Sequence, residues 1–588
     1  MKLEAFNAKH LKSEDIAGSF VSSKLFLETA KNEHTILVGP RGSGKTTFLR
    51  MLSINTLSKW DKAKELDIEY DGIYVPGDLV WGEMIKSLDE VGLKSEISES
   101  FAYSAFFTHV MLNTLETIEH SLSRFNKEFL EKRSKEVNQS LVEICELLKL
   151  KPEKISFSRL RHELILKLNQ LGEYSRKISL LGSSSFDDSE FQDKAPYAFK
   201  DLKISLESVL SSIDRALERP NHRWALLLDE FEIAPKNLLD KVLSSMRSSA
   251  QKVIFKVALV PCGFHQEVKT VTSAINDYSI VELWYVTKGE SNEFCTNLVA
   301  SKFGISNPVE KLGSTKFGSR VTTNPNLWCE VFEELFNKDD SFKTFILSKK
   351  INFKEIFLSS EATPSLIRKI SPIVAFRNAF LNKNGKRKGR RALPEFYSGW
   401  EAISTISEGN PRWLLSVLSP LMSNDQSSRI NYSAQMSKVD NSTNSYAAML
   451  KTLPLSNNMG LTTKQPIYDL LELIGKYFNQ RLIDLPFNST LKTAFTVDQA
   501  VTKDIEAALM IAWNYGAIVS VGSENTFGSY DSLQGMRFRL SYLLSPKFEL
   551  NLTTNSTVNL SAILNPGLKA KKDLIYDNID DPQQDMFL

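Results

Sequence analysis

Short apolar runs separated by polar loops predict strands in the N-terminal half of the chain. Residues 35–38 and 224–228 are continuously apolar or β-branched, as expected for parallel strands covered on both faces. Residues 68–76 and 252–263 are predicted to form two further strands. Apolar residues at 46–57 follow three- and four-residue spacing, which is typical of an amphipathic helix. Strands that alternate with helices indicate an α/β fold with a parallel sheet.

A long helical stretch, at about 78–196, interrupts this pattern and is predicted to be a large helical insertion. One apolar stripe contains Leu115, Ile118, Leu122, Phe125 and Phe129, and a second contains Leu160, Leu164, Leu168 and Leu171. The first stripe alternates three- and four-residue steps, the spacing of a coiled-coil seam. We expect two such helices to pair as an antiparallel hairpin that projects from the core. It would be either an arm for partner contacts or an ordinary helical subdomain.

The C-terminal pattern differs. Two amphipathic helices are followed by a strand, a loop rich in Gly, Ser and Asn, and a second strand, at 464–478, 503–518, 518–522, 522–534 and 536–544. This order predicts a winged helix over 464–560. Residues 423–463 are rich in Ser, Asn, Asp and Gln with little periodicity, so they are predicted to be a linker.

Composition excludes several classes of protein. The hydrophobic fraction of 42% and charged fraction of 24% are ordinary for a soluble globular chain. The formal net charge of +2 shows no overall basic signature, so any DNA contact must come from a local patch. The four cysteines are far apart in the sequence, which argues against a zinc ribbon or a disulfide framework. With no apolar leader and no run of membrane-spanning length, we expect a cytoplasmic protein without a membrane segment.

Residues 39–46 carry the first candidate chemistry, between the predicted strand and helix. They match G-x-x-x-x-G-K-[ST] without a mismatch, as Gly39, Pro40, Arg41, Gly42, Ser43, Gly44, Lys45 and Thr46, followed by Thr47. Glycines allow backbone amides to face phosphate oxygens, and the following helix directs its N-terminal dipole at the anion. Lys45 would supply positive charge and Thr46 would bind Mg²⁺. The pattern predicts ATP and Mg²⁺ as ligands, the alternative being a plain glycine-rich turn.

Asp229 and Glu230 follow the apolar run 224–228. Open α/β sheets bind ligands at the carboxyl ends of their strands. Asp229 would hold Mg²⁺ and Glu230 would polarise the attacking water, although a solvated strand end could also carry two acids. We interpret Glu232 as a third, non-catalytic acid. The next strand ends in Val260-Pro261-Cys262 without an Asn, Ser or Thr to touch the γ-phosphate, which weakens the prediction of hydrolysis.

These motifs together resemble initiator-type AAA+ ATPases, the branch that includes origin-recognition-complex subunits and their bacterial relatives. The resemblance rests on the run before and through the phosphate loop, on "SEGNPRWLLSVLSPLM" and on the C-terminal helix and strand order. It implies a P-loop AAA+ core with a parallel sheet over 1–290, a helical lid over 291–422 and a C-terminal winged-helix domain. Phe20 and Val21 would then lie near the adenine. Arg412 would be the lid arginine that contacts the γ-phosphate, the alternative being a surface arginine.

Local basic residues suggest where DNA would bind. Six cations fall within nine residues, Lys383, Lys386, Lys388, Arg387, Arg390 and Arg391. They predict a flexible basic loop that either contacts phosphate backbones or is simply solvated. The second winged-helix helix begins with Lys503, Asp504 and Glu506, so DNA and protein contacts remain open for that domain. Arg537 and Arg539 alternate along a predicted strand and would either contact phosphate or face solvent.

The tail at 561–588 ends in "DDPQQDMFL". Gln583, Met586 and Phe587 resemble a terminal peptide that docks on a sliding clamp, with a disordered tail as the default.

We expect an ATPase that couples nucleotide state to DNA or partner-protein contacts, with an oligomer or an effector protein as partner. Arg247 and Arg320 are candidates for an arginine donated to a neighbour's site. The resemblance to bacterial relatives raises the hypothesis of a role in antiphage defence. The alternative is a nucleotide-gated scaffold or sensor that turns over little or no ATP and acts through protein contacts. A small-molecule kinase is disfavoured because the chain continues into a lid and a winged helix.

Overall fold

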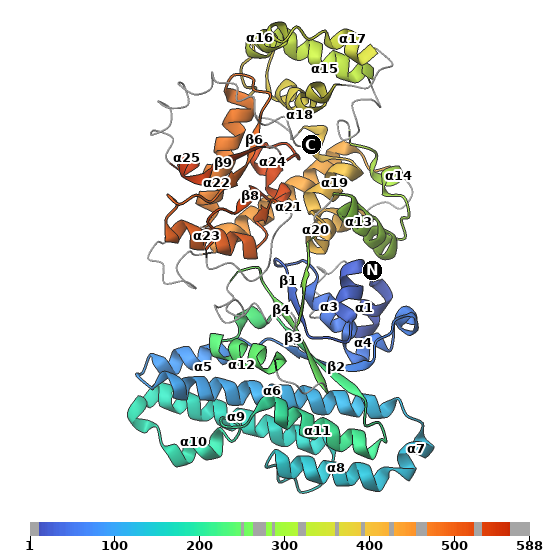
Figure 1. Cartoon of the computed structure of the whole chain (residues 1–588), viewed down its shortest axis with the longest axis vertical. Coiled ribbons are helices and arrows are strands. Elements are labelled where there is room, and N and C mark those ends of the chain that lie inside the picture. Colours follow the sequence, from blue (N-terminus) through green and yellow to red (C-terminus); the bar gives the residue numbers. More distant parts are fainter. Residues whose placement is uncertain are drawn as a thin grey trace. The chain divides into compact units, whose positions relative to one another are not determined.

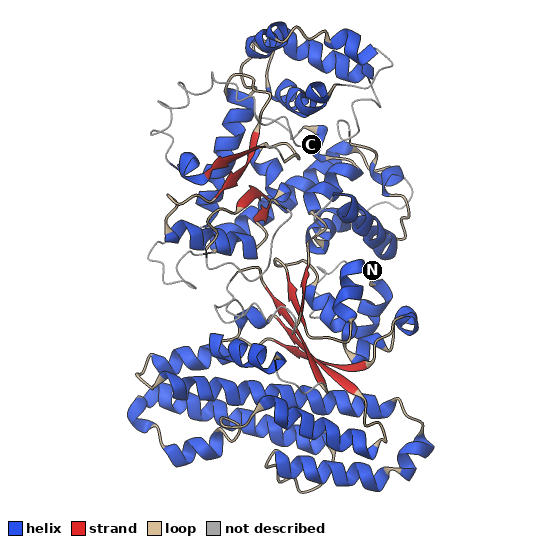
Figure 2. Cartoon of the chain, viewed as in Figure 1, coloured by secondary structure: helices blue, strands red, loops and turns tan. Residues whose placement is uncertain are grey.

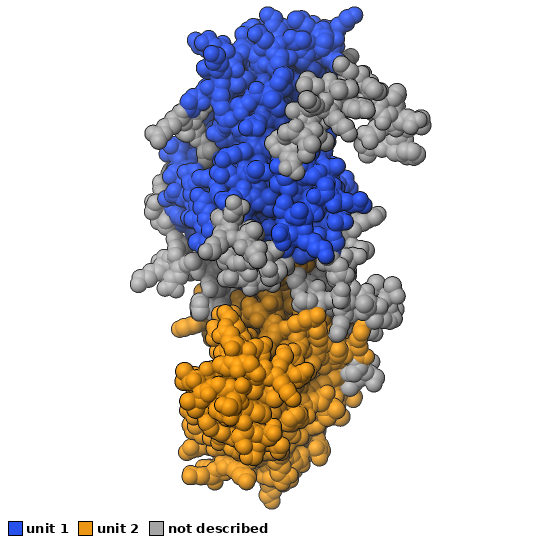
Figure 3. Space-filling view, turned by 90° about the vertical axis from the view of Figure 1, so that its left-hand side faces the viewer, with its two compact units in different colours: residues 1–6, 40–43, 284–588 blue, residues 7–39, 44–283 orange. Residues whose placement is uncertain are grey.

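A computed structural model of the chain describes most of its residues, namely 11–247, 252–262, 278–284, 288–315, 325–358, 364–389, 394–422, 429–453, 467–522, 532–554 and 556–564. The chain divides into two compact units (Figure 3). Unit 2 comprises Asn7–Gly39 and Gly44–Leu283, and unit 1 comprises Met1–Phe6, Pro40–Ser43 and Trp284–Leu588. Each unit is described by itself below.

Unit 2 is built on a parallel sheet with the strand order β2-β3-β4-β1-β5 (Figure 2). The strands are β1 (Thr35–Val38), β2 (Tyr70–Pro76), β3 (Arg223–Asp229), β4 (Val253–Leu259) and β5 (Ser279–Glu282). All neighbouring pairs are parallel, and β4 lies between β1 and β3. The predicted strands at 35–38, 68–76, 224–228 and 252–263 are therefore confirmed, while β5 has too short an apolar run to be predicted.

The N-terminal helices cover one face of this sheet through a shared apolar core. They are α1 (Ser13–Ser19), α2 (Lys24–Ala30), α3 (Lys45–Leu52) and α4 (Ile54–Leu57). Leu49 of α3 is buried in the same cluster as Leu37 of β1 and Ala258 of β4. The predicted helix at 46–57 is thus two helices, since α3 ends at Leu52 and Ser53 is extended before α4 begins.

A layer of helices forms the insertion between β2 and β3 (Figure 1). The helices are α5 (Val80–Asp89), α6 (Ser95–Ser123), α7 (Lys127–Lys132), α8 (Ser134–Leu147), α9 (Phe157–Leu181), α10 (Asp188–Lys194) and α11 (Leu202–Ala216). The short helix η4 (Phe231–Ile233) and α12 (Lys236–Met246) follow β3.

Helices α6 and α9 run antiparallel, as the two apolar stripes predict. Glu119 near the end of α6 pairs with Arg161 near the start of α9. The rings of Phe101 and Tyr174 meet at the opposite ends, with centroids 5.6 Å apart. Most members of the two stripes are buried, namely Leu115, Ile118, Leu122, Leu160, Leu164 and Leu171. Phe125 and Phe129 lie beyond α6 and stack on each other instead.

The expectation that this hairpin projects from the core is wrong, because a buried carboxylate ties it to the sheet. Asp71 of β2 is 5% exposed. Its oxygens accept hydrogen bonds from the Ser121 hydroxyl of α6 at 2.8 Å and from Arg124 at 2.7 Å, and lie 3.1 Å from His222 Nε2. A buried carboxylate requires such partners, so α6 packs onto the sheet as part of an ordinary helical subdomain.

The same network predicts a pH-dependent contribution to stability. Burial of Asp71 opposes ionisation, but His222, Arg124 and Ser121 outweigh it and lower the pKa from 3.8 to about 2. A lowered folded-state pKa stabilises the protein above the ordinary value, and this stabilisation is lost as the pH falls through about 2. We expect Asp71→Asn to cost about 2 kcal/mol at neutral pH. Thermal unfolding of both proteins between neutral and strongly acid pH should show the difference shrinking, and a pH-independent difference would contradict this assignment.

Unit 1 begins with helices, several of them stacked in a compact group (Figure 1). They are α13 (Lys288–Phe303), α14 (Pro308–Leu312), α15 (Pro325–Lys338), α16 (Asp340–Ser348), α17 (Phe353–Leu358), α18 (Ser365–Phe380), η8 (Glu395–Tyr397), α19 (Trp400–Ser407), α20 (Pro411–Met422) and α21 (Tyr432–Thr452). The prediction of a linker over 423–463 is wrong for α21, a helix of 21 residues. Its narrow buried stripe, Met436, Val439, Thr443, Tyr446 and Leu450, repeats every three or four residues but is diluted by polar neighbours.

A second sheet with the order β7-β8-β6-β9 completes unit 1. In chain order, the helices and strands of this part of unit 1 are α22 (Ile467–Asn479), η9 (Gln480–Asp484), β6 (Lys492–Thr496), α23 (Lys503–Asn514), β7 (Ile518–Ser520), β8 (Arg537–Leu540), η10 (Tyr542–Leu544), α24 (Ser545–Phe548), β9 (Ser556–Asn559) and α25 (Leu560–Leu564). Strand β8 pairs antiparallel with β6 and β7, whereas β9 pairs parallel with β6. The two helices and two strands predicted here are present, β6 and β9 were not predicted, and most of the loop at 522–534 lies outside the described residues.

Across the described ranges, no helix has both the length and the apolarity needed to cross a lipid bilayer.

Candidate functional site

The phosphate loop connects β1 to α3 and has the backbone that its glycines permit. Gly42 has φ of 88° and Gly44 has φ of 102°, left-handed values that other residues adopt only with strain. The N–H of Ser43 donates to the Pro40 carbonyl at 3.2 Å and closes the turn. Helix α3 starts directly at Lys45, so the first N–H groups of the helix lie at the end of the loop.

Lys45 lies inside this loop. The residue is 7% exposed, and its Nζ donates to the Gly39 carbonyl at 2.6 Å. The ammonium group is thus held by the first residue of the loop, and positive charge beside the N–H donors of such a loop favours an anion. The arrangement is chemically suited to a phosphate group.

Thr46 and Asp229 are brought together although 183 positions separate them. The Thr46 hydroxyl donates to Asp229 Oδ1 at 3.2 Å. Asp229, at the end of β3, is 1% exposed, and burial raises the pKa of its carboxyl group against the opposing effect of its hydrogen bonds. Mg²⁺ prefers oxygen ligands and commonly takes one or two from a protein while phosphates and waters supply the rest. The hydroxyl and carboxylate oxygens therefore fit a magnesium ion bound with a nucleotide.

Tyr74 is a member of this site that the sequence analysis missed. Its hydroxyl donates to Asp229 Oδ2 at 2.8 Å. Burial and the neighbouring Asp229 raise the pKa of Tyr74 above its usual range, so it remains a neutral donor. The available signal was a tyrosine near the carboxyl end of a predicted strand, where ligands bind.

Glu230 has an unusual backbone conformation. Its φ is 49° and ψ 34°, in the left-handed region that is sparsely populated by residues other than glycine. Gly77, just after β2, donates its N–H to the Asp229 carbonyl at 2.8 Å. A Cβ on Gly77 would lie 2.8 Å from the Glu230 carbonyl oxygen, so only glycine fits this approach. Residues with such sparsely populated backbone angles concentrate at functional sites, where contacts with the surrounding structure hold them in place.

Phe20 and Val21, expected near the adenine, lie at the end of α1 and are half-buried. The ring of Phe20 packs edge-on against Phe26, Trp60 and Phe48, with centroids 4.5, 5.3 and 6.1 Å away. Phe48 is in the first turn of α3, so Phe20 is close to the helix that carries Lys45. Their contact with a base stays a prediction.

Within unit 1, Pro40–Ser43 group with residues around the start of α20 and the end of α23. Asn410 Nδ2 donates to the Arg41 carbonyl at 3.3 Å, and Asn410 Oδ1 accepts from the N–H of Arg412 at 3.0 Å, which caps α20. A Cβ built on Gly42 would lie 3.0 Å from Arg412 Cβ. The Arg41 guanidinium lies 4.6 Å from the centre of the Tyr515 ring. No pattern in the sequence indicates Tyr515 as a neighbour of the phosphate loop.

Strand β4, which pairs with β3, ends without a polar side chain of the kind that contacts a γ-phosphate, as the sequence indicates. Strand β4 stops at Leu259, and Val260 and Cys262 after it are buried. Over 252–262 this end therefore offers no Asn, Ser or Thr to a phosphate.

The expectation of a flexible basic loop is wrong for its described part. The N–H of Asn382 donates to the Lys386 carbonyl at 2.8 Å, and that of Lys388 to the Phe380 carbonyl at 2.9 Å, which forms a tight turn. Arg387 pairs with Asp484 at 3.1 Å and with Glu549. Lys388 Nζ donates to the Ala379 carbonyl at 2.6 Å, whereas Lys383 and Lys386 are exposed. Arg390 and Arg391 lie outside the described residues.

Arg539 neither faces solvent nor is available to phosphate, which corrects both expectations for it. Its guanidinium pairs with Glu408 and lies 3.8 Å from the centre of the Tyr542 ring. Arg537, two positions earlier on the same face of β8, is exposed. Glu506 is buried and accepts from the Ser532 hydroxyl at 2.6 Å, so this acid of α23 is structural.

The remaining candidates are not brought to the site. Arg247 is exposed at the end of α12. Arg320 and the tail residues Gln583, Met586 and Phe587 lie outside the described residues. Among the described residues no group of three or more His, Cys, Asp or Glu could hold a metal, so the Thr46–Asp229 pair is the oxygen site to consider.

The strand order, the phosphate loop after β1 and the acid pair at the end of β3 define a P-loop nucleotide-binding core of the AAA+ class. In an open α/β sheet this is the edge where ligands bind. The chain belongs to the ORC-CDC6-like family, whose model matches residues 1–560. This confirms the resemblance to initiator-type AAA+ proteins and supports a nucleotide-using protein. No curated protein and no solved structure matches the chain.

Proposed function

We propose that this protein is a Mg²⁺-dependent ATPase that couples its nucleotide state to contacts with DNA or a partner protein. The observation that carries the proposal is the Thr46 hydroxyl held 3.2 Å from the buried Asp229 carboxylate, next to the loop that encloses Lys45. Two oxygen ligands for a metal beside a phosphate cradle are the parts that phosphoryl transfer from ATP requires.

Each side chain has a separate role in this proposal. Loop amides and Lys45 hold the β- and γ-phosphates, and Thr46 and Asp229 hold the magnesium ion. Glu230 orients and polarises the attacking water. Arg412 contacts the γ-phosphate, while Phe20 and Val21 border the base. The bound ion would neutralise charge that develops on the phosphate oxygens.

We propose that the helices over 291–422 act as a lid and that 464–560 is a winged helix. The α22–β6–α23–β7–β8 order with antiparallel pairing supports the second assignment. The exposed Lys383 and Lys386, with Arg390 and Arg391, remain candidates for DNA phosphates. An oligomer, an effector protein or, through the tail, a sliding clamp are further candidate partners. The hypothesis of antiphage defence is best tested by the identity of neighbouring genes.

Removal of Lys45 tests the nucleotide site. We expect Lys45→Ala to weaken binding of a fluorescent ATP analogue by about 100-fold or more, because a charge-assisted contact to phosphate is lost. Titration by fluorescence anisotropy measures the affinity. Lys59→Ala, which removes an exposed lysine paired with Glu14, is the matched control and should bind normally. An unchanged affinity in Lys45→Ala would overturn the proposal.

A nucleotide-gated scaffold with little turnover is the second candidate. Two observations favour it: the apolar end of β4, and the pairing of Arg387 and Arg539 with acids of this chain, which neutralises two candidate cations for DNA. Turnover measured with and without duplex DNA separates the two functions. Stimulation by DNA supports the coupled ATPase, whereas ATP binding without turnover, unaffected by DNA, supports the scaffold.

Tyr74 gives a finer prediction about the metal. Tyr74→Phe removes a hydrogen bond to a buried carboxylate, which should raise the pKa of Asp229 further and weaken magnesium binding. We expect the Mg²⁺ concentration for half-maximal turnover to rise by about tenfold, with ATP affinity little changed. The control is Tyr70→Phe on the same strand, since that hydroxyl donates to the Ala30 carbonyl instead. An unaltered Mg²⁺ dependence would show that Tyr74 does not support the metal ligand.

A further inference from the structure

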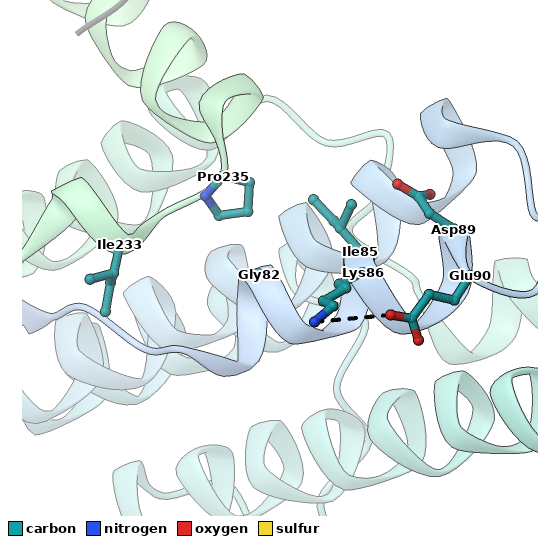
Figure 4. Close-up of a pocket in the computed structure, with 7 residues that line it drawn as sticks. All are labelled: Gly82, Ile85, Lys86, Asp89, Glu90, Ile233 and Pro235. Atoms are coloured by element: carbon teal, nitrogen blue, oxygen red, sulfur yellow. Dashed lines mark ion pairs between the residues drawn. The ribbon is translucent and has the colours of Figure 1, made fainter. Parts of the chain in front are cut away.

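A groove lies between α5 and the residues that follow Glu230. It has a volume of about 620 Å³ and is lined by Gly82, Ile85, Lys86, Asp89, Glu90, Ile233 and Pro235 (Figure 4). One wall is α5 and the other is the end of η4 with the residues before α12. All of these residues belong to unit 2.

The groove combines an apolar surface with an acidic rim. Ile85 faces Pro235 across it, and Ile233 lies at the same wall as Pro235 (Figure 4). On the rim, Lys86 lies 4.0 Å from Glu90, which offsets one of the two acids. Asp89 remains as an acid in excess, so the rim carries a net negative charge.

An exposed leucine extends the apolar surface along the helix. Leu79 is 62% exposed, and it precedes Lys86 by seven positions and Gly82 by three. Residues at these spacings share one face of a helix. A single exposed leucine is ordinary on a protein surface, but beside an apolar groove it enlarges the area that another chain can cover.

We propose that this groove binds an extended peptide segment of a partner protein, one in which an apolar side chain is flanked by lysine or arginine. The apolar side chain would lie against Ile85, Ile233 and Pro235, and the cation would pair with Asp89. The net negative rim repels phosphates, so a nucleic acid does not fit this chemistry. This partner site deepens the proposed ATPase function and rests on it for the regulatory step below.

The groove is connected to Glu230 through its own wall. The N–H of Ile233 donates to the Glu230 carbonyl at 3.1 Å. A Cβ placed on Gly77 would lie 3.1 Å from Ile233 Cδ1 and 2.8 Å from the Glu230 carbonyl oxygen, so these three residues form one packed contact. A peptide segment bound against Ile233 would therefore change the packing next to Glu230, whose backbone is left-handed. A ligand that prefers one backbone state of the acid shifts its population and hence the rate of hydrolysis.

Direct binding is tested with two short fluorescein-labelled peptides, one of alternating leucine and lysine and one of alternating leucine and glutamate. Gly82→Trp fills the groove, because the nearest atom to its Cβ is 3.9 Å away and a larger side chain can enter. Val80→Trp is the matched control on the same helix, since Val80 is 40% exposed and does not line the groove. We expect the basic peptide to bind the wild-type chain and Val80→Trp equally. Gly82→Trp should bind it at least about tenfold more weakly, and the acidic peptide should not bind.

Turnover tests the regulatory step separately. Saturating basic peptide should change the ATPase rate by about tenfold in the wild type and not in Gly82→Trp, with ATP affinity constant. Equal peptide binding by Gly82→Trp and wild type would overturn the docking site. Lost binding in Gly82→Trp with no peptide effect on wild-type turnover would overturn the regulation. Peptide binding that depends on Gly82, in a wild-type chain that shows no ATP turnover, would support the docking site while the proposed ATPase function fails.

Gel filtration tests a second copy of the chain as the occupant. If neither peptide binds, and Gly82→Trp converts a dimer into a monomer, the occupant is a second copy of the chain and the peptide assignment is overturned.

Discussion

Glu230→Gln should lower ATP turnover by about 10²- to 10³-fold while it leaves the affinity for ATP within about twofold of the wild type. The carboxylate is the proposed group that polarises water, and it holds neither the phosphates nor the metal. Glutamine has nearly the same shape but carries no charge, so the substitution removes the carboxylate without requiring a change in the left-handed backbone at this position. Turnover in a coupled assay and ATP affinity by anisotropy separate the two effects.

Glu232→Gln is the matched control for that experiment. Glu232 lies on η4, two positions after Glu230, and we interpret it as non-catalytic. It should retain most of the wild-type turnover. Undiminished activity in Glu230→Gln would contradict its role as the water-orienting acid, and an equal loss in both variants would point to a general disturbance of the segment. Any stimulation by DNA should also disappear in Glu230→Gln.

Glu408→Ala should destabilise unit 1 by about 3–5 kcal/mol, because it leaves the buried guanidinium of Arg539 without its carboxylate partner. The Ser541 hydroxyl, which donates to Glu408 Oε2 at 2.7 Å, would lose its acceptor as well. The pair joins β8 to the turn between α19 and α20, just before Gly409 to Arg412. Hydrogen exchange followed by mass spectrometry should show loss of protection over both segments.

A double variant distinguishes an unpaired charge from simple loss of packing. Glu408→Ala with Arg539→Met removes both charges and should recover a large part of the stability lost in Glu408→Ala, since an apolar pair of similar volume is tolerated. Arg537→Met, on the same strand but exposed, should change stability by less than about 0.5 kcal/mol. If the double variant is no more stable than Glu408→Ala, the ion pair is not the source of the effect.

Sequence reasoning reached those parts of the site that depend on local chemistry. A glycine-rich turn between a strand and a helix needs only neighbouring residues, so 39–46 could be recognised directly. The apolar run before Asp229 likewise identifies a buried strand and the acid at its end. Helical spacing predicted the α6–α9 pairing because both faces are apolar along several turns.

The errors occurred where polar residues have partners that are distant in the sequence. Arg387 and Arg539 are basic in the sequence, but Glu549 and Glu408, which neutralise them, are more than 100 positions away along the chain. Helix α21 was read as a linker because its buried stripe is narrow and the rest of its surface is polar. Tyr74 was missed because a tyrosine in a strand is usually packed in the core, and only strand pairing shows that its hydroxyl reaches Asp229.

By itself, the sequence determined which residues can cradle a phosphate, where β1 to β4 of the first sheet lie, and which acid ends a buried strand, since each of these follows from local spacing. Only the tertiary structure decided that Thr46 and Tyr74 share one carboxylate, that Gly77 approaches Glu230, and that Arg387 and Arg539 are paired with acids of the same chain. The physical reason is that a polar group's role depends on whether an opposite group meets it away from water, and pairs brought together by strand register or helix packing leave no mark in local sequence.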